Sequence, residues 1–256
     1  MPNGTTKRHL RRVYRTGDDF RRYSWQDEKR RHTLIALFRR YRRYFGPRVL
    51  DLGCGGGVLG LVVDGAGLSY VGVDGNPDMI REARTWARRR GSKARFLQGD
   101  LGTFRLAGQY DTITVLGNTM AHLTVDQFDR LLARLAHHVG PGCLLLIDYR
   151  DLVAMFWNGT WTHVKVQTFV RGRVTHRTRL VDLRSGRLEM SARSSSGRWR
   201  LRWSHAIWSP FILESMMRSR GWRLVQRVVS RSSGQGGQPP EAYLDVYRRG
   251  SRARRS

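Results

Sequence analysis

Residues 49–60 read VLDLGCGGGVLG, an apolar run with one carboxylate that changes into a glycine-rich segment. This pattern predicts a buried strand that ends in a tight turn and leads into a helix. Gly53, Gly55 and Gly57 let the backbone pass close to a ligand where a Cβ atom would clash. The sequence therefore predicts a ligand-binding turn at the carboxyl end of a strand.

A second strand is predicted over residues 69–73, and it ends at Asp74. Asp74 follows the glycines by about 20 residues, the spacing at which a carboxylate can accept hydrogen bonds from both hydroxyls of a ribose. The turn lacks the Gly-Lys-Ser/Thr end of a phosphate-binding loop, and it departs from the Gly-x-Gly-x-x-Gly pattern of dinucleotide binders. Together these features indicate a nucleoside site.

The motifs along the chain resemble those of one enzyme family. The pattern Asp-x-Gly-x-Gly-x-Gly at residues 51–57 resembles motif I of the class I S-adenosylmethionine-dependent methyltransferases, with Asp74 as the ribose carboxylate of that family. Residues 98–101 resemble its third motif, where an Asp and its neighbour meet the adenine, and residues 110–115 resemble its fourth strand. The four motifs occur in the family's order.

This resemblance implies S-adenosyl-L-methionine as the cofactor. It also implies an α/β fold, a Rossmann-like seven-stranded methyltransferase sheet with helices on both faces. The residues expected to bind the cofactor are Asp51, Gly53, Cys54, Gly55, Gly57, Asp74, Gly75, Asn76, Met79, Asp100, Leu101, Leu116 and Gly117.

The composition fits a soluble, cytoplasmic protein. A chain of 256 residues suits one large domain with an elaboration. Its two cysteines, Cys54 and Cys143, form neither a disulfide framework nor a metal-ligand set, so no metal is expected. No apolar run reaches membrane-spanning length, and the N-terminus lacks the apolar core of a signal peptide.

The chain order predicts four segments. An amphipathic helix is expected over about residues 26–44, and short alternating strands separated by glycine turns indicate an antiparallel β insert after the fifth strand. The last of these strands alternates, with Trp203 and His205 on one face and Arg202 on the other. The segments are a basic N-terminal arm and helix (1–45), the S-adenosylmethionine-binding Rossmann-like core (46–150), the β insert (151–208), and the C-terminal completion of the core with a basic tail (209–256).

The position of the insert resembles glycine and sarcosine N-methyltransferases and sugar-amine N-methyltransferases, in which such a sheet covers the substrate. Residues 116–123, LGNTMAHL, resemble the LGNSFAHL segment of the glycine enzymes, and residues 146–151 resemble their VIDHRN segment. The resemblance implies that Asn118 and Arg150 contact a substrate carboxylate. Tyr149 stands where the family has His, so it also enters the predicted catalytic set.

The residues themselves support these roles, but they leave structural alternatives open. Arg150, at the carboxyl end of a central strand, can grip a carboxylate with two hydrogen bonds, or it can pair with Asp151. Asn118 lies at the predicted crevice, or it caps a turn. His122 can orient the cofactor or accept an amine proton, or it is a buried histidine bonded to backbone.

Positive charge lies at the two ends of the sequence. The net charge is +27; residues 1–48 hold 15 Lys and Arg against 4 Asp and Glu, residues 49–150 hold 11 against 10, and residues 151–256 hold 21 against 6. This excess favours a second hypothesis, an RNA methyltransferase that uses its arginine-rich flanks. Against it, the Asn-Pro-Pro-aromatic motif of exocyclic base methylation is absent after the fourth strand.

The sequence thus predicts a methyltransferase that acts on a small amine, one bearing a carboxylate. RNA methylation is the alternative, and a non-catalytic S-adenosylmethionine-binding protein is a third. Tyr23, Trp25, Trp157, Trp161, His163 and His205 are further candidates to close over or line the substrate pocket. A glycine-type relative implies a homo-oligomer, although no interface is specified by the sequence.

Overall fold

The structure, a computed structural model, describes residues 25–104, 107–160, 164–169, 172–182, 184–197, 200–229 and 239–250. The predicted arm over residues 1–22, Tyr23, Trp161 and His163 lie outside these ranges, as does the end of the basic tail. Within them, no helix combines the length and apolar character needed to cross a membrane.

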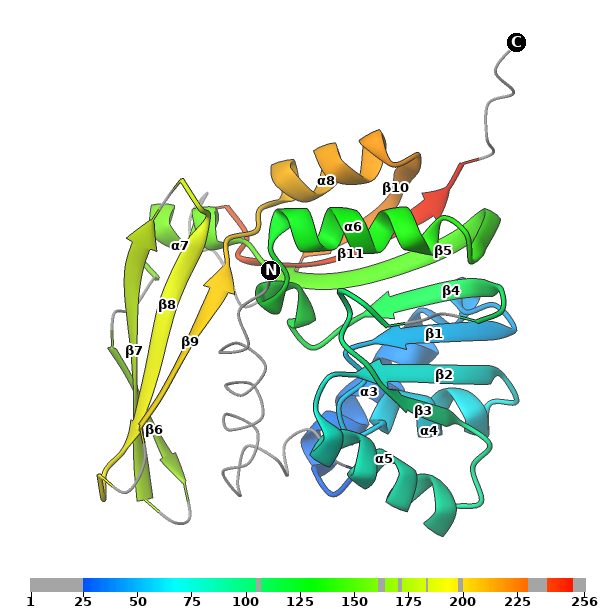
Figure 1. The fold of residues 1–256 in the computed structure, drawn as a ribbon, viewed down its shortest axis with the longest axis horizontal. Helices are drawn as coiled ribbons and strands as arrows, with labels where there is room; N and C mark the ends of the chain where they lie inside the picture. Colours follow the sequence, from blue (N-terminus) through cyan, green and yellow to red (C-terminus); the bar gives the residue numbers. More distant parts are fainter. Residues whose placement is uncertain are drawn as a thin grey trace.

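Seven strands form the central sheet, in the order β10-β11-β5-β4-β1-β2-β3 (Figure 1). Strands β1 to β5 run parallel to one another, and β11 is antiparallel to both of its neighbours. This confirms the predicted fold class. The strands are β1 (Arg48–Leu52), β2 (Ser69–Asp74), β3 (Arg95–Gln98), β4 (Tyr110–Val115), β5 (Val139–Arg150), β10 (Trp222–Val229) and β11 (Ala242–Arg249).

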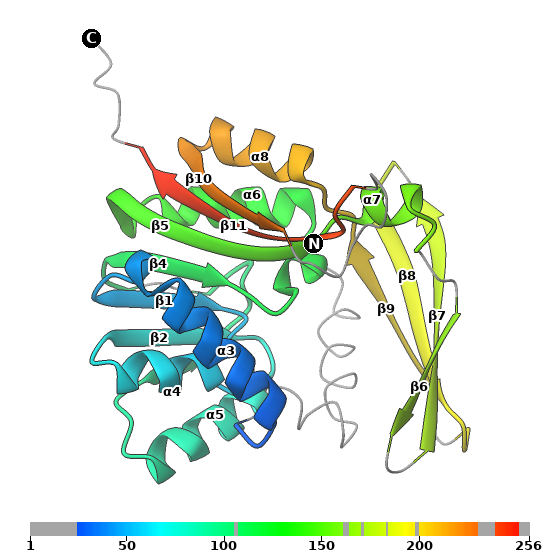
Figure 2. The same cartoon turned by 180° about the vertical axis from the view of Figure 1, so that it is seen from behind.

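Helices cover both faces of this sheet. The nearer face in Figure 1 carries α6 (Val125–Leu135) and α8 (Pro210–Ser219), and the opposite face, seen in Figure 2, carries α3 (Glu28–Arg40) and α4 (Val58–Gly65). The helix that follows β2, α5 (Pro77–Arg89), shares its buried core with α3 and α4. Polar side chains cap the N-termini of α3, α5, α6 and α8; for example, Thr124 and Gln127 form a reciprocal capping box at α6.

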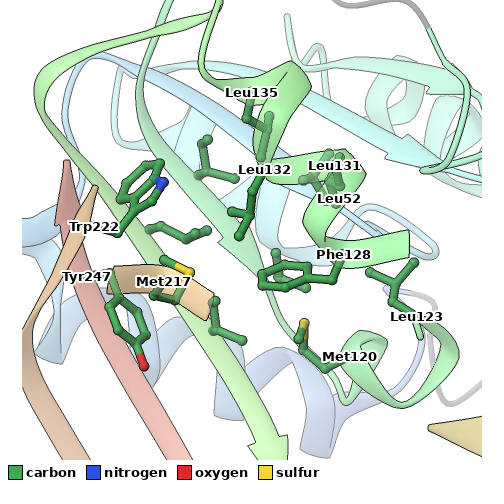
Figure 3. Close-up of a cluster of buried hydrophobic side chains, with 14 of the residues drawn as sticks. Leu52, Met120, Leu123, Phe128, Leu131, Leu132, Leu135, Met217, Trp222 and Tyr247 are labelled. Atoms are coloured by element: carbon green, nitrogen blue, oxygen red, sulfur yellow. The ribbon is translucent and has the colours of Figure 1, made fainter. Parts of the chain in front are cut away.

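Each face has its own apolar core. Phe128, Leu131, Leu132 and Leu135 of α6 are packed together with Met217 of α8, Trp222 and Tyr247 (Figure 3). The strand between the two cores, β5, buries Leu145, Leu146 and Ile147 completely. Burial on both faces explains why residues 144–147 in the middle of this strand are all apolar.

A second sheet holds four antiparallel strands in chain order: β6 (Val164–Phe169), β7 (Gly172–Asp182), β8 (Arg187–Ser194) and β9 (Arg200–Ala206). It stands beside the edge at which the parallel strands of the core end (Figures 1 and 2). The predicted antiparallel insert is therefore present, and it faces the edge that carries the predicted site.

Three local predictions differ from the structure. The first helix ends at Arg40, and a separate 3-10 turn, η1 (Arg42–Tyr44), follows it. Strand β5 contains a bulge that was not predicted, because its register with β4 moves from Tyr110↔Val139 to Thr112↔Leu144. The insert also begins with an unpredicted helix, α7 (Leu152–Trp157), which Asp151 caps by accepting from the Val153 and Ala154 amides.

A buried carboxylate joins the last two strands to β5. Asp245 is 0% exposed, and it accepts hydrogen bonds from Nε and Nη2 of Arg227 at 2.9 and 2.8 Å. The hydroxyls of Tyr149 and Tyr247 donate to the same carboxylate at 3.0 and 3.1 Å. Because these donors satisfy the charge, the carboxylate can be buried in an apolar layer.

We expect Arg227→Met to lower the free energy of unfolding by about 3–5 kcal/mol, since it leaves a buried carboxylate without its cation. Arg223→Met, on the exposed side of the same strand, should change it by no more than about 0.5 kcal/mol. Urea unfolding followed by circular dichroism measures both. Equal losses in the two variants would contradict the assigned role of Arg227.

Candidate functional site

The glycine turn is tied to the neighbouring strand. The backbone amides of Gly53 and Cys54 donate to the Val73 carbonyl at 2.8 and 3.1 Å. Gly53 has a φ of +83°, and a Cβ atom there would collide with the side chain of Thr119. Contact with protein, rather than with a ligand, therefore makes glycine necessary at this position, which corrects the reason given from the sequence.

Gly57 needs to be glycine for a related reason. Its φ is +78°, and a Cβ atom would lie 2.7 Å from the ring of Phe96 and 2.8 Å from Ala83. The third glycine of the motif thus allows α4 to begin close to β3 and α5. The glycine pattern shapes the turn mainly through packing.

Asp51 lies beneath this turn and is 4% exposed. Its carboxylate accepts hydrogen bonds from the Tyr70 hydroxyl on β2 and from the Thr114 hydroxyl on β4, the latter at 2.7 Å. Burial raises the pKa of Asp51 to about 6, and the two hydroxyls oppose that rise. Asp51 therefore links three adjacent strands and adds a buried carboxyl group to the site.

Asp74 holds the ends of two connecting turns together. One carboxylate oxygen accepts from the Gly55 amide at 2.9 Å, and the other accepts from the Asn76 amide at 2.8 Å. A carboxylate has about four acceptor positions, so capacity remains for ligand hydroxyls. Gly75, which lies between Asp74 and Asn76, is exposed. A Cβ atom at this position would lie near only the Gly99 carbonyl oxygen.

Asn76 and Met79 complete this corner. Asn76 is 4% exposed, and its Oδ1 accepts from the Asp78 amide to cap α5. Its Nδ2 is buried and has no hydrogen-bond partner in the described part of the chain, so a donor is available next to Asp74. Met79 is buried below it in the first turn of α5.

The segment after β3 forms a compact turn. Asp100 accepts the Gly102 amide with Oδ1 at 2.7 Å, and its carbonyl accepts the amides of Thr103 and Phe104 at 2.8 Å each. Arg134 of α6 donates to the Leu101 carbonyl, which fixes the turn against the core. Asp100 and Leu101 therefore follow the end of β3, whose last residue, Gln98, pairs with Asp74 of β2.

The loop after β4 is held by Asp148 of β5. The amides of Gly117 and Asn118 donate to the two Asp148 oxygens, each at 2.8 Å, while Leu116 is buried. Asn118 has a φ of +64°, the only positive value for a non-glycine residue among those that the structure describes. Such a conformation persists where the surroundings impose it, and it is common at binding sites.

Arg30 of α3 is a site residue that the sequence analysis missed. Its Nη2 lies 2.9 Å from the position that a Cβ atom on Gly117 would occupy. Its positive charge lowers the pKa values of Asp51 and Asp148, although burial outweighs this effect and raises both. A signal was present, because Arg30 stands four residues before the buried Leu34, on the apolar stripe of the helix.

The predicted catalytic residues separate into two groups. Arg150 is exposed at the end of β5, and within the described ranges its side chain forms no hydrogen bond or ion pair; Asp151, its predicted alternative partner, caps α7 instead. Tyr149 points into the core, where its hydroxyl donates to Asp245. The structure therefore brings Asn118 and Arg150 to the same sheet edge and holds the Tyr149 hydroxyl in the core.

His122 ends the short helix η2 (Thr119–His122), which follows Asn118. Its ring packs edge-to-face on His205 of β9, with centroids 5.0 Å apart. Burial lowers the pKa of His122 to about 4, so the imidazole is neutral at physiological pH. Trp157, another predicted pocket residue, is 82% exposed on α7, and Trp25 packs near Arg31 and Arg90.

A metal centre is not formed by the described residues, since no three His, Cys, Asp or Glu side chains among them are grouped to hold an ion. The thiol of Cys54 is buried, and burial raises its pKa well above the ordinary value. The polar groups that the structure gathers at the site are carboxylates, amides, guanidinium groups and imidazoles.

The chain is similar to known methyltransferases over its first half. Residues 49–142 match the family model described as a methyltransferase domain. A stretch of 115 residues is 34% identical to the ribosomal protein L11 methyltransferase of Thermus thermophilus, covering 45% of this chain and 42% of that protein. Glycine N-methyltransferase of Mus musculus is 33% identical over 133 residues, covering 46% and 44%. The chain thus spans less than half the length of these relatives.

The similarity in fold extends further than the similarity in sequence. The crystal structure of the CcbJ methyltransferase from Streptomyces caelestis superposes with a TM-score of 0.73 at 16% identity, covering 96% of this chain and 98% of that one. The sheet order, the glycine turn and the matched domain agree with one another. Residues 49–142 thus match a methyltransferase domain, and the fold of the chain is that of S-adenosylmethionine-dependent methyltransferase structures.

Proposed function

We propose that this protein transfers a methyl group from S-adenosylmethionine to a small amine that carries a carboxylate. The observation that carries this proposal is the position of Arg150. Its exposed guanidinium stands at the carboxyl end of β5, two residues after the Asp148 carboxylate that holds the Asn118 loop. A guanidinium in that position can bind a carboxylate through two parallel hydrogen bonds.

The residues at the sheet edge fit the cofactor. S-adenosylmethionine supplies a methyl group on a sulfonium and carries an adenosine, a carboxylate and an ammonium group. Asp74 retains acceptor capacity for the ribose hydroxyls, and Asn76 offers the unpartnered Nδ2 beside it. Arg30, against Gly117, would bind the carboxylate. Asp100 and Leu101 stand at the neighbouring strand end, where the family resemblance places the adenine.

For the methyl acceptor, the main task of the protein is to position it. Methyl transfer proceeds in line, so a neutral amine must be held close to the methyl carbon, and holding it there supplies much of the rate. In this proposal Arg150 binds the acceptor's carboxylate, the Asn118 side chain orients it, and the neutral His122 orients the amine by accepting a hydrogen bond from its N–H group. The Tyr149 hydroxyl, which is bonded to Asp245, supports the strand that presents Arg150.

The second candidate, RNA methylation, finds less support. Strand β9 would need to present aromatic rings and arginines on one surface to stack and bind a nucleic-acid strand. Instead His205 contacts His122 of the core and Trp203 shares its face, while Arg200 and Arg202 are exposed. The similarity to glycine N-methyltransferase, over less than half of that protein, is further support for the amine hypothesis.

We expect Arg30→Gln to weaken binding of S-adenosylhomocysteine by about tenfold or more, because a charged hydrogen bond to its carboxylate is lost. Binding of 5′-methylthioadenosine, which lacks that carboxylate, should change by less than about twofold. Arg31→Gln is the matched control, since Arg31 instead bonds the Trp25 carbonyl at 3.0 Å. Calorimetric titration of both variants with both ligands measures these affinities. If Arg30→Gln weakened the binding of the two ligands equally, Arg30 would not be the residue that binds the cofactor's carboxylate.

The acceptor proposal is tested with methyl-labelled S-adenosylmethionine in a host-cell extract. Filtration separates small metabolites from macromolecules, and the large fraction is treated with nuclease. We expect label in the small fraction, reduced at least about tenfold by Arg150→Ala and little changed by Arg202→Ala, with cofactor affinity retained in both. Nuclease-sensitive label in the large fraction, lowered by Arg202→Ala, would favour RNA. Cofactor binding without any labelled product would favour a non-catalytic protein.

A further inference from the structure

The last insert strand, β9, turns an uncharged aromatic surface toward the core. His205 meets the His122 ring of η2, and Trp203 lies two residues earlier on the same face. The residues paired with them on β8 are Leu188 and Met190, so both cross-strand neighbours on this face are also uncharged. The insert thus contacts the loop that follows β4 through a pair of imidazoles.

A hydrogen bond fixes one of these imidazoles. The indole Nε1 of Trp203 donates to His205 Nε2 at 3.1 Å. Indole nitrogen is only a donor, so Nε2 must be the unprotonated nitrogen and the proton of neutral His205 must lie on Nδ1. Protonation of His205 would place two N–H groups against each other, and the bond would be lost.

A second tryptophan fixes the segment that bears His122. Trp208 is buried at the point where the insert returns to the core, and its indole N–H donates to the carbonyls of Met120 and Leu123, at 2.8 and 3.0 Å. These carbonyls flank His122 in the chain. The insert therefore holds both the backbone of η2 and the ring that packs on His122.

We propose that Trp203 and His205 are positioning residues for the methyl acceptor, which fix the orientation of the His122 imidazole beside the Asn118 loop. This inference rests on the proposed function, since it assigns the insert a task in that reaction. It explains why the Trp203 N–H bonds the His205 ring and the Trp208 N–H bonds the backbone of η2.

The groups around Trp203 and His205 keep the two imidazoles of His122 and His205 uncharged. Among the residues that the structure describes, the titratable groups that face His205 and Trp203 are His122 of η2 and His176 of β7, whose ring lies 6.2 Å from that of Trp203. Burial, with a smaller contribution from His122, lowers the pKa of His205 to about 3. Both rings of the pair are therefore neutral at physiological pH, and a proton on either would weaken the contact.

The test is a pH titration of the folded protein labelled with ¹⁵N-histidine, followed by long-range ¹H–¹⁵N correlation spectra. Signals are assigned with His205→Gln and His122→Gln. In the wild type we expect His205 in the Nδ1–H tautomer and neutral down to about pH 5. In Trp203→Phe, which keeps the ring and removes the donor, the His205 midpoint should rise by about one pH unit or more.

Trp86→Phe is the matched control, because the Trp86 indole donates to Glu82 on α5, away from the insert. It should leave both histidine titrations unchanged. An Nε2–H tautomer of His205 in the wild type, or equal titrations in Trp203→Phe and Trp86→Phe, would overturn the proposal. The wild-type spectrum alone determines the tautomer of His205, even if the Trp203 variant fails to fold.

Methyl transfer into the small-molecule fraction provides the functional readout. Trp203→Phe should lower the rate at least about threefold at pH 6 and at pH 8 alike, because both rings stay neutral at these pH values, and it should leave the affinity for S-adenosylhomocysteine unchanged. A rate loss with an equal loss of affinity for S-adenosylhomocysteine would indicate a purely structural role and overturn the proposal. If the wild type labels no small molecule, the proposed function fails, whereas the tautomer and titration results still decide whether the imidazole pair is fixed.

Discussion

The structure depends on a carboxylate that joins two turns. Asp74 accepts the Gly55 amide with one oxygen and the Asn76 amide with the other, so the turn after β1 and the turn after β2 are held at a fixed separation. Asp148 repeats the arrangement with the amides of Gly117 and Asn118. Backbone amides bonded to buried carboxylates thus shape the carboxyl edge of the sheet, the usual place for a ligand in an open parallel sheet.

These carboxylates also set the electrostatics of the site. Burial raises the pKa values of Asp51, Asp74 and Asp148, because it removes part of the water around each carboxylate. A buried anion of this kind favours a cationic ligand, and S-adenosylmethionine carries a sulfonium and an ammonium group. Arg30 supplies a positive charge where the cofactor's carboxylate would lie. A protein with a net charge of +27 therefore has an acidic edge at its cofactor site.

The sequence predicted those features that local patterns determine. The glycine turn, Asp74 and the alternation of Trp203 and His205 are readable from residues that are close in the chain, and the structure places them accordingly. Local patterns do not determine which distant residues a long side chain contacts. Arg30 reaches the Gly117 loop from a helix that the sequence marks only as amphipathic, and the Tyr149 hydroxyl bonds to Asp245, 96 residues later. Helix α7 was not predicted, and Asp151, considered only as an alternative partner for Arg150, is the residue that caps it.

The central claim is that Asp74 binds the ribose of S-adenosylmethionine, and it is tested most directly by calorimetric titration of Asp74→Ala with S-adenosylhomocysteine. Asp64→Ala is the matched control, because Asp64 bonds Ser92 and Lys93 at the far end of α4. The account predicts a Kd at least about 100-fold higher for Asp74→Ala, from the loss of two charged hydrogen bonds, and a nearly unchanged value for Asp64→Ala. A folded Asp74→Ala protein that binds as tightly as the wild type would contradict the account.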